Sequence, residues 1–475
     1  MKKNRSAIFM ACLLCMASLA AQDSFFDGSD MISGENDDST KTTSSSLDIS
    51  GNAQLGIRFY PHKDIKQVAA MPSFALHLKY AGTNTELDSH LKLKPLTIKE
   101  YPWDVLDEFT MRAFLGDFVL SAGKMKLVWG KGDKLHVLDV FNANDFTDFI
   151  IPDYIDRRLG EPMVHLAYNA PIPLKLELAW APTMTPDRVA EKGMWVPAQR
   201  EQMQQTLISM FAPFIGIVPP QFKPIVIPMI ENVKGDFLPN TKDIKYGQYG
   251  LRLTGSAGPT DMGFQYYYGH YKTPSLDAES MKKNIMKGNF EHLPDCVYYD
   301  PLHIFGIDFG AAVAMFNFRS ELAYYLTYDF KGDDPAVHNN SIQWVLGFDV
   351  DIPLNNLNVN VQNIGSYTIG FNKVKDNHTG GKFDMDWNTS EKSTANKLVV
   401  NISDSWLNER LSDSLTVMWG IENNDVIIMP NIKYKIKDEF YIEGKGGYLY
   451  AENKKSEFPN WKNNHFIQLS AEYHF

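Results

Sequence analysis

The chain has 475 residues, a formal net charge of −11 at pH 7 and an aromatic content of 13%. This length suits one large barrel or two or three soluble domains. The negative charge argues against nucleic-acid binding, which favours basic surfaces. The aromatic content suits a protein with aromatic girdles at membrane interfaces.

Residues 1–20 have the pattern of a cleaved secretory signal peptide. A basic start precedes the apolar run Ala7–Ala17, which is too short to span a membrane, and small residues follow. Cys12 and Cys15 lie in this segment without a good context for lipid attachment. Once the segment is removed, Cys296 has no partner, so we expect no internal disulfide.

Residues 21–46 are rich in Asp, Ser and Thr and are predicted to be a disordered periplasmic lead-in. From residue 47 onward, apolar and polar residues alternate in many segments, for example 174–180 and 432–437, which predicts strands. Charged residues on one face of a strand need water, and apolar residues on the other face need lipid or a protein core. A soluble sandwich places the polar face outside, whereas a membrane barrel places it in a wet lumen.

The connections between the strands favour the barrel. Short turns alternate with connections that are mostly longer, as expected for a barrel with short periplasmic turns and long outer loops. About eight short turns and nine outer loops give about 18 strands, and 16 would also fit. No apolar stretch after residue 20 is long enough for a membrane helix. We therefore predict an all-β, transmembrane antiparallel barrel over residues 47–475, with long loops at 127–161 and 182–244.

The final segment, 465–475, is predicted to be a strand with one apolar and one polar face. It ends in Tyr473, His474 and Phe475, and a closing aromatic resembles the signal that outer-membrane barrels present to their assembly machinery. A half-buried strand of a soluble β domain is the alternative. The expected location is the bacterial outer membrane.

The loop 182–244 is unusually apolar for a loop. It could pack on itself or on a neighbouring subunit, form a lid or constriction that touches a hydrophobic substrate, or contact the membrane surface. Loops of this length are often functional. The apolar candidates are Phe211, Phe214, Ile215, Ile217, Ile225 and Ile227.

A patterned segment, 122–146, contains Trp129-Gly130-Lys131-Gly132-Asp133 and a Leu-Asp-x-x-Asn-x-x-Asp run from Leu138 to Asp145. It lacks the Gly-Lys-Ser/Thr ending of a phosphate-binding loop. Together with the short runs 249–255, 266–270, 318–324 and 346–349, it resembles a family of uncharacterised bacterial outer-membrane proteins. These are porin-like barrels known mainly as a domain of unknown function. The resemblance implies a large barrel and hints at the handling of lipidic or hydrophobic compounds.

Polar residues in the segment after residue 127 and in the predicted strands are candidates for lining a constriction. A charge in a strand is costly against lipid, so the lumen is preferred. Alternatively, Trp129, Gly130 and Asp139 fold the loop on itself against the barrel wall. The candidates are Arg112, Lys124, Asp133, Asp139, Asn142, Asn144, Asp145, Arg157, Arg158, Arg252, Arg319 and Glu321.

These features predict an outer-membrane channel that passes small solutes or hydrophobic compounds through a loop-constricted lumen. Two alternatives remain: a plugged transporter of lipidic substrates, and a surface adhesin or assembly module. We expect no enzyme, cofactor or metal site; Asp384 and Asp386 are expected to belong to a solvated loop rather than a calcium site. The expected partners are outer-membrane lipid, the barrel-assembly machinery, a small solute or hydrophobic substrate and, in a homo-oligomer, further copies of the chain.

Overall fold

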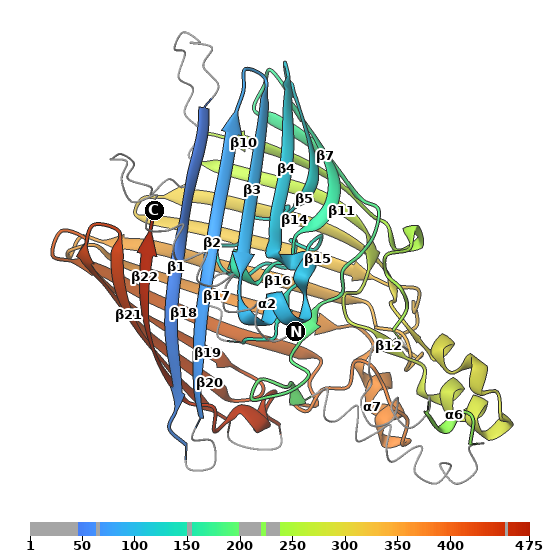
Figure 1. Ribbon diagram of the computed structural model, residues 1–475. Coiled ribbons are helices and arrows are strands. Elements are labelled where there is room, and N and C mark those ends of the chain that lie inside the picture. Colours follow the sequence, from blue (N-terminus) through green and yellow to red (C-terminus); the bar gives the residue numbers. More distant parts are fainter. Residues whose placement is uncertain (1–45, 63–66, 150–153, 199–219, 225–237, 452–454) are drawn as a thin grey trace, which may run out of the picture. The chain divides into compact units, whose positions relative to one another are not determined.

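The chain forms a closed antiparallel barrel of 18 strands (Figure 1), which confirms the predicted fold class and strand number. The computed structural model describes residues 46–62, 67–149, 154–198, 220–224, 238–451 and 455–475. The predicted signal peptide and lead-in lie outside these ranges, apart from Ser46. None of the helices within them is long and apolar enough to cross a membrane.

Neighbouring strands in the chain pair with each other around the barrel, and the first strand pairs with the last. The barrel strands are β1 (Ser46–Tyr60), β2 (Gln67–Ala81), β3 (Thr85–Leu93), β4 (Leu106–Leu115), β5 (Phe118–Met125), β7 (Glu161–Asn169), β8 (Leu174–Ala181), β10 (Gln248–Ala257), β11 (Thr260–His270), β14 (Pro301–Val313), β15 (Phe316–Leu326), β16 (Ser341–Ile352), β17 (Leu357–Thr368), β18 (Thr394–Trp406), β19 (Leu411–Gly420), β20 (Asp425–Lys437), β21 (Phe440–Tyr450) and β22 (Phe466–His474).

The two faces of each strand differ because side chains alternate between the outside and the lumen. On β14, Phe305 and Ile307 are 49% and 46% exposed on the outside, whereas the inward Asp308 is 2% exposed. Exposed apolar rows of this kind recur on the other barrel strands. An apolar outer face and a polar inner face are the pattern of an outer-membrane barrel.

The barrel closes where β1 meets β22, with Asn52 opposite His474 and Phe59 opposite Ile467. Phe475 continues this pairing, because it exchanges two backbone hydrogen bonds of 2.8 and 3.0 Å with Gly51. Its ring stacks on Phe74 of β2 at 6.0 Å between centroids. The closing aromatic is therefore part of the seam.

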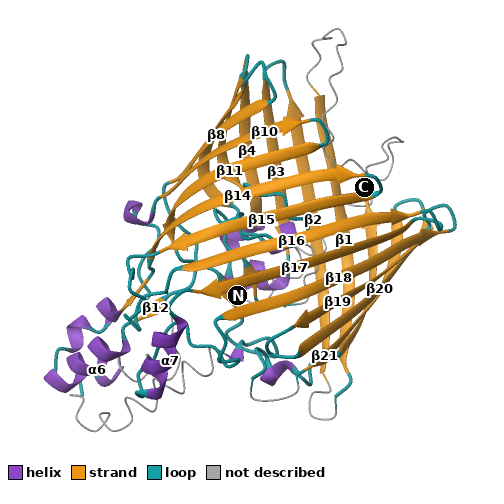
Figure 2. Cartoon of the chain, turned by 180° about the vertical axis from the view of Figure 1, so that it is seen from behind, coloured by secondary structure: helices purple, strands orange, loops and turns teal. Residues whose placement is uncertain are grey.

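The remaining elements lie in the connections, and Figure 2 shows α6 and α7 near each other at one end of the barrel. Helix α6 begins after Asp277, which accepts a 2.8 Å bond from Ser280 N, and ends at Gly288 in the left-handed conformation. The helices are α2 (Pro95–Glu100), α3 (Tyr154–Arg157), α6 (Ala278–Lys287) and α7 (Phe371–Thr379), with 3-10 turns η1 (Pro102–Val105), η4 (Ile244–Tyr246), η5 (Phe290–His292), η6 (Pro294–Cys296) and η7 (Pro459–Trp461). Short strands pair as β6 (Asp145–Phe146) with β9 (Arg188–Val189) and β12 (Ser275–Leu276) with β13 (Val297–Tyr298).

Candidate functional site in the barrel lumen

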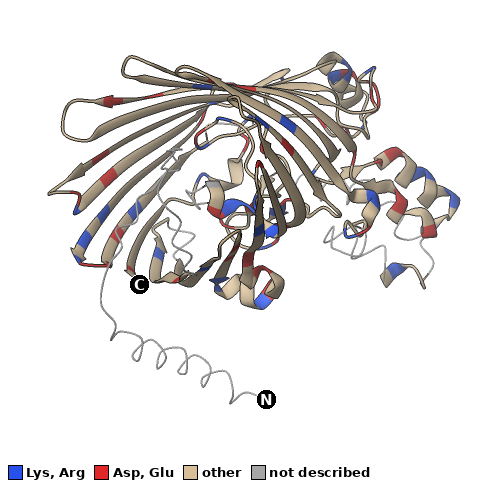
Figure 3. Cartoon of the chain, turned by 90° about the horizontal axis from the view of Figure 1, so that it is seen from above, with Lys and Arg blue, Asp and Glu red and all other residues tan. Residues whose placement is uncertain are grey.

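The segment between β5 and β7, of which residues 126–149 and 154–160 are described, folds against the inner wall of the barrel; we call these residues the plug loop. Figure 3 shows chain segments with charged residues inside the ring of strands. Trp129, Leu138 and Phe141 of the plug loop are 1%, 0% and 1% exposed. They form one apolar cluster with inward side chains of the wall, namely Met163, Ala179, Ala181, Tyr267, Leu302, Ile304, Ala323, Tyr325 and Val345. Burial of this apolar surface holds the loop inside the lumen.

Glu321 of β15 anchors the plug loop to the wall. It is 1% exposed and accepts bonds from the backbone N–H groups of Gly132 (2.7 Å), Val137 (2.8 Å) and Leu138 (3.1 Å). Its Oε1 also lies 2.9 Å from Nδ1 of His136. Hydrogen bonds to a charged acceptor are stronger than neutral ones. One wall carboxylate therefore fixes the turn of the loop from Gly132 to Leu138.

Glycines let the loop approach this closely. Gly130 has φ +111°, and a Cβ there would lie 2.1 Å from Oε1 of Glu321. On the wall, a Cβ at Gly250 would lie 2.6 Å from the rings of Trp129 and Phe141, and one at Gly306 would lie 2.2 Å from Leu138. A side chain at any of these positions would displace the loop.

Asn142 and Arg158 tie the plug loop to itself. The Asn142 amide accepts from Leu127 N (2.8 Å) and donates to the carbonyls of Met125 (2.9 Å) and Leu159 (2.8 Å). Arg158 is 5% exposed, donates to the carbonyls of Asn142 and Asp139, and pairs with the Asp139 carboxylate at 2.7 Å. Buried polar groups need such partners. At these positions the polar side chains stabilise the conformation of the loop.

The start of the second long loop packs beside the plug loop, through the parallel pair β6–β9. Asp187 accepts a 2.7 Å bond from Asn144 N, and Arg188 pairs with Asp145 at 3.1 Å and with Asp104 at 2.5 Å. Arg157 lies over the ring of Phe146, with 5.4 Å from Cζ to the centroid. The described start of the second long loop is thus joined to the plug loop by backbone pairing, hydrogen bonds and ion pairs.

Between the plug loop and the wall lies a cavity of about 240 Å³ with charges of both signs. Its lining includes Asp139, Arg158, Asp187 and Lys272. Nζ of Lys272 donates to Oε1 of Gln248 (2.8 Å) and to the Phe141 carbonyl (3.0 Å). Within the described residues, Oδ1 of Asp139 has no hydrogen-bond partner. The cavity therefore offers both a buried ammonium and a carboxylate oxygen to a polar guest.

Burial shifts the pKa values of the groups in this cavity. It lowers the pKa of Lys272 to about 8, although Glu161 and Asp187 lie near enough to oppose the shift. It raises the pKa of Asp139 despite the neighbouring Arg158, and it raises the pKa of Asp187. Desolvation disfavours the charged form of each group. The charge of the cavity is consequently sensitive to pH just above neutrality.

The other predicted residues lie elsewhere on the wall. Arg252 pairs with Asp308 at 2.8 Å, and Arg319 lies 3.5 Å from Asp133 of the plug loop and 3.3 Å from Asp349. Arg112 pairs with Glu86 on β3. Lys124 is bound to Asp104 (3.2 Å) and the Leu106 carbonyl (2.7 Å), near the start of β4. Arg319 and Glu321 thus contact the plug loop, to which Asp133 belongs. Lys124 borders the end of the plug loop, since a Cβ at Gly160 would lie 3.2 Å from its Cγ, whereas the ion pairs of Arg112 are with wall carboxylates.

Several important residues were missed from the sequence. Lys272 follows the run 266–270, and Gln248, the first residue of β10, directly precedes the run 249–255, in which only Arg252 was named as a candidate. Asp187 lies in a loop considered only for its apolar part. A polar residue directly beside a predicted strand end was the available signal. The apolar candidates Phe211, Phe214, Ile215, Ile217, Ile225 and Ile227 lie outside the described residues.

Asp384 and Asp386 take part in a network of loop contacts. Asp386 lies 3.0 Å from Nδ1 of His338 and accepts a 2.5 Å bond from Asn339 N. Asp384 accepts a 2.9 Å bond from the Asn377 amide. The contacts of Asp386 join the connection after β15 to the one after α7, and the bond of Asp384 ties that second connection to α7 itself.

The family model described as "Protein of unknown function (DUF1302)" matches residues 99–350, which include the plug loop and the wall strands that hold it. The chain belongs to this family. The resemblance inferred from the sequence is thereby confirmed. No curated protein matches the chain.

Several solved structures are similar to the chain at very low sequence identity. OccAB4 of Acinetobacter baumannii is 9% identical, with a TM-score of 0.45 over 91% of this chain and 98% of that chain. A BenF-like porin from Pseudomonas fluorescens Pf-5 is 8% identical, with a TM-score of 0.47 over 91% and 98%. OpdK of Pseudomonas aeruginosa is 9% identical, with a TM-score of 0.45 over 91% and 98%.

Proposed function

We propose that this protein is a channel of the bacterial outer membrane that passes small polar solutes through a lumen narrowed by the plug loop. The observation that carries the proposal is the cavity of about 240 Å³ between the plug loop and the wall. Its lining combines the bases Arg158 and Lys272 with the acids Asp139 and Asp187. Rings of charged side chains are a common basis of selectivity in pores.

The balance of charges favours small solutes that carry polar or charged groups. A solute carboxylate can replace the carbonyl that Lys272 now contacts, and a solute ammonium or hydroxyl can donate to Oδ1 of Asp139. Such interactions are strong where water is excluded. A solute can leave again only if no single site holds it tightly, so passage requires several weak sites along the lumen. An uncharged wall would lack this selectivity.

Single-channel recording in a planar bilayer tests the proposal. The refolded protein is expected to give stable current steps with ion selectivity, and Lys272→Met should shift the reversal potential toward cations. Lys245→Met is a matched control, because Lys245 lies in η4 outside the cavity lining. A correctly folded barrel that passes no current would refute the channel.

A hydrophobic-compound transporter is the second candidate, and one observation favours it. The outer face of β7, β8, β10 and β11 has an apolar hollow of about 460 Å³, lined by residues that include Leu178, Trp180 and Tyr249. The wall is thin there, because Gly250 has no side chain between the hollow and the plug loop. Uptake of an apolar dye by vesicles that lack any conductance would favour this function over the channel.

Two partners of the barrel follow from its outer face and its last strand. We expect outer-membrane lipid to cover the apolar outer rows, and the barrel-assembly machinery to recognise the strand that ends in Tyr473 and Phe475. Replacing Phe475 with Ala should lower the amount of folded protein in outer membranes. An unchanged amount would contradict this role.

A further inference from the structure

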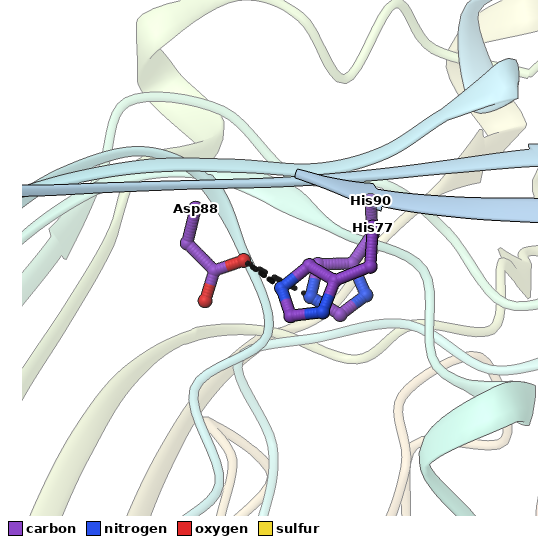
Figure 4. Close-up of side chains that lie close together, drawn as sticks. All are labelled: His77, Asp88 and His90. Carbon is purple, nitrogen blue, oxygen red and sulfur yellow. Dashed lines mark hydrogen bonds and ion pairs between the residues drawn. The ribbon is translucent and has the colours of Figure 1, made fainter. Parts of the chain in front are cut away.

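We propose that the lumen wall binds one divalent transition-metal ion through His77, Asp88 and His90. His77 lies on β2, and Asp88 and His90 lie on β3. One ligand atom from each residue lies within 4.8 Å of the other two. Figure 4 shows both imidazoles turned toward the same carboxylate.

The strand register builds this cluster. His77 and His90 are directly opposite each other in the β2–β3 pair, and their ring centroids are 4.0 Å apart. Asp88 lies two residues before His90, so both side chains are on the same face of β3. The strand pairing fixes the backbone at all three residues before an ion binds. Binding therefore has to order only the side chains.

The distances suit a metal of the zinc type. Nε2 of His77 is 2.8 Å, and Nε2 of His90 is 3.1 Å, from the same Oδ1 of Asp88. Ligand atoms at about 2.0–2.1 Å from a tetrahedral zinc ion lie roughly 3.3–3.4 Å apart. If the distances from Oδ1 of Asp88 to the two imidazole nitrogens increased by a few tenths of an ångström, the ion would fit between the three atoms. Two imidazoles and one carboxylate leave a fourth position for water or a solute, as in open zinc sites.

The surrounding charges orient the carboxylate without occupying Oδ1. Arg112 lies 3.6 Å from Oδ2 of Asp88 and pairs with Glu86, which Lys79 approaches at 3.6 Å. These two cations and two carboxylates balance each other. Affinity would therefore come from the imidazole nitrogens, which favours zinc, copper or nickel over calcium and magnesium.

The side chains are accessible. Those of His77 and His90 are 34% and 36% exposed, and that of Asp88 is 19% exposed. Two residues further along β3, Lys92 pairs with Asp156 of the plug loop at 2.6 Å. The site therefore lies on the part of the wall next to the plug loop.

Calorimetric titration of the refolded protein with Zn²⁺ in detergent tests the proposal, whether or not the barrel conducts. We expect one equivalent of Zn²⁺ to bind, and we expect His77→Gln and His90→Gln each to weaken binding at least tenfold. His292→Gln is the matched control, because His292 lies 3.0 and 3.7 Å from two carboxylates but, among the described residues, belongs to no cluster with a second imidazole. Wild-type protein that binds no Zn²⁺, or variants that bind like wild type, would overturn the site.

A second measurement needs no variant and so does not depend on the folding of the substituted barrels. One equivalent of Cu²⁺ added to the wild-type protein should give an electron paramagnetic resonance spectrum with coupling to two imidazole nitrogens. A spectrum without nitrogen coupling would overturn the proposal.

Discussion

Replacing Glu321 with Ala should release the plug loop from the barrel wall. The carboxylate accepts three backbone bonds of 2.7–3.1 Å from the loop, and it is 1% exposed. Without it, three N–H groups lose their acceptor. A buried donor without a partner costs about 1–3 kcal/mol, and the lower end applies where lumen water can enter. The docked state of the loop should therefore lose about 3 kcal/mol relative to the released state.

A loss of about 3 kcal/mol raises the ratio of released to docked loop roughly a hundredfold. The barrel itself should remain intact, because the backbone pairing of β15 with β14 and β16 does not involve this side chain. In a planar bilayer, we expect either a larger conductance or frequent transitions to a larger step.

Asp308→Ala is the matched control for this experiment. Asp308 is directly opposite Glu321 on β14, is 2% exposed, and pairs with Arg252 of the wall. Its loss removes a buried wall carboxylate without breaking a bond to the plug loop. If both variants changed the conductance equally, or if Glu321→Ala conducted like wild type in a folded barrel, the anchoring role would be refuted.

Three further substitutions test the same arrangement. Gly306→Ala should raise the conductance because its Cβ would lie 2.2 Å from Leu138, whereas Gly310→Ala on the same strand has its nearest atom at 3.8 Å and should have no effect. Gly130→Ala should raise the conductance as Glu321→Ala does, because its Cβ would displace the Glu321 carboxylate. Gly193 also has a positive φ but has no atom within 4 Å of its Cβ position, so Gly193→Ala should leave the conductance unchanged. Equal effects of the two substitutions would indicate backbone strain alone. Lys272 has a pKa lowered to about 8, so it is charged below that pH and neutral above it. Anion preference, measured as reversal potential, should therefore fall between pH 7 and 9, and a fall that persists in Lys272→Met would contradict this.

The alternation of apolar and polar residues was enough to predict the barrel, because side-chain direction in a strand depends only on position along it. The same rule indicated that Arg252 and Glu321 avoid lipid. It could not show what Glu321 binds, since its partners are 183–189 residues away in the chain. Nor could it place His77 opposite His90, because that pairing depends on the length of the intervening turn. Wall glycines such as Gly250 were uninformative in the sequence, since their role depends on the ring that lies against them.

The inner wall differs from strand to strand, and this difference bears on the path of a solute. The plug loop covers the apolar inner residues of β7, β8, β11 and β14–β16. It also reaches β1 and β20–β22, where Phe149 packs against a cluster that includes Tyr60, Ile427 and Phe466. The same strands carry polar inner pairs such as Asn52 with Glu472 (3.1 Å) and Lys433 with Glu472 (2.9 Å). Water and polar solutes favour these polar stretches of the wall, because charged walls keep water in the lumen and apolar walls do not. His77, Asp88 and His90 form another polar stretch, on β2 and β3, near the pair of Lys92 with Asp156 of the plug loop, so an ion bound there would border the path at the edge of the plug loop.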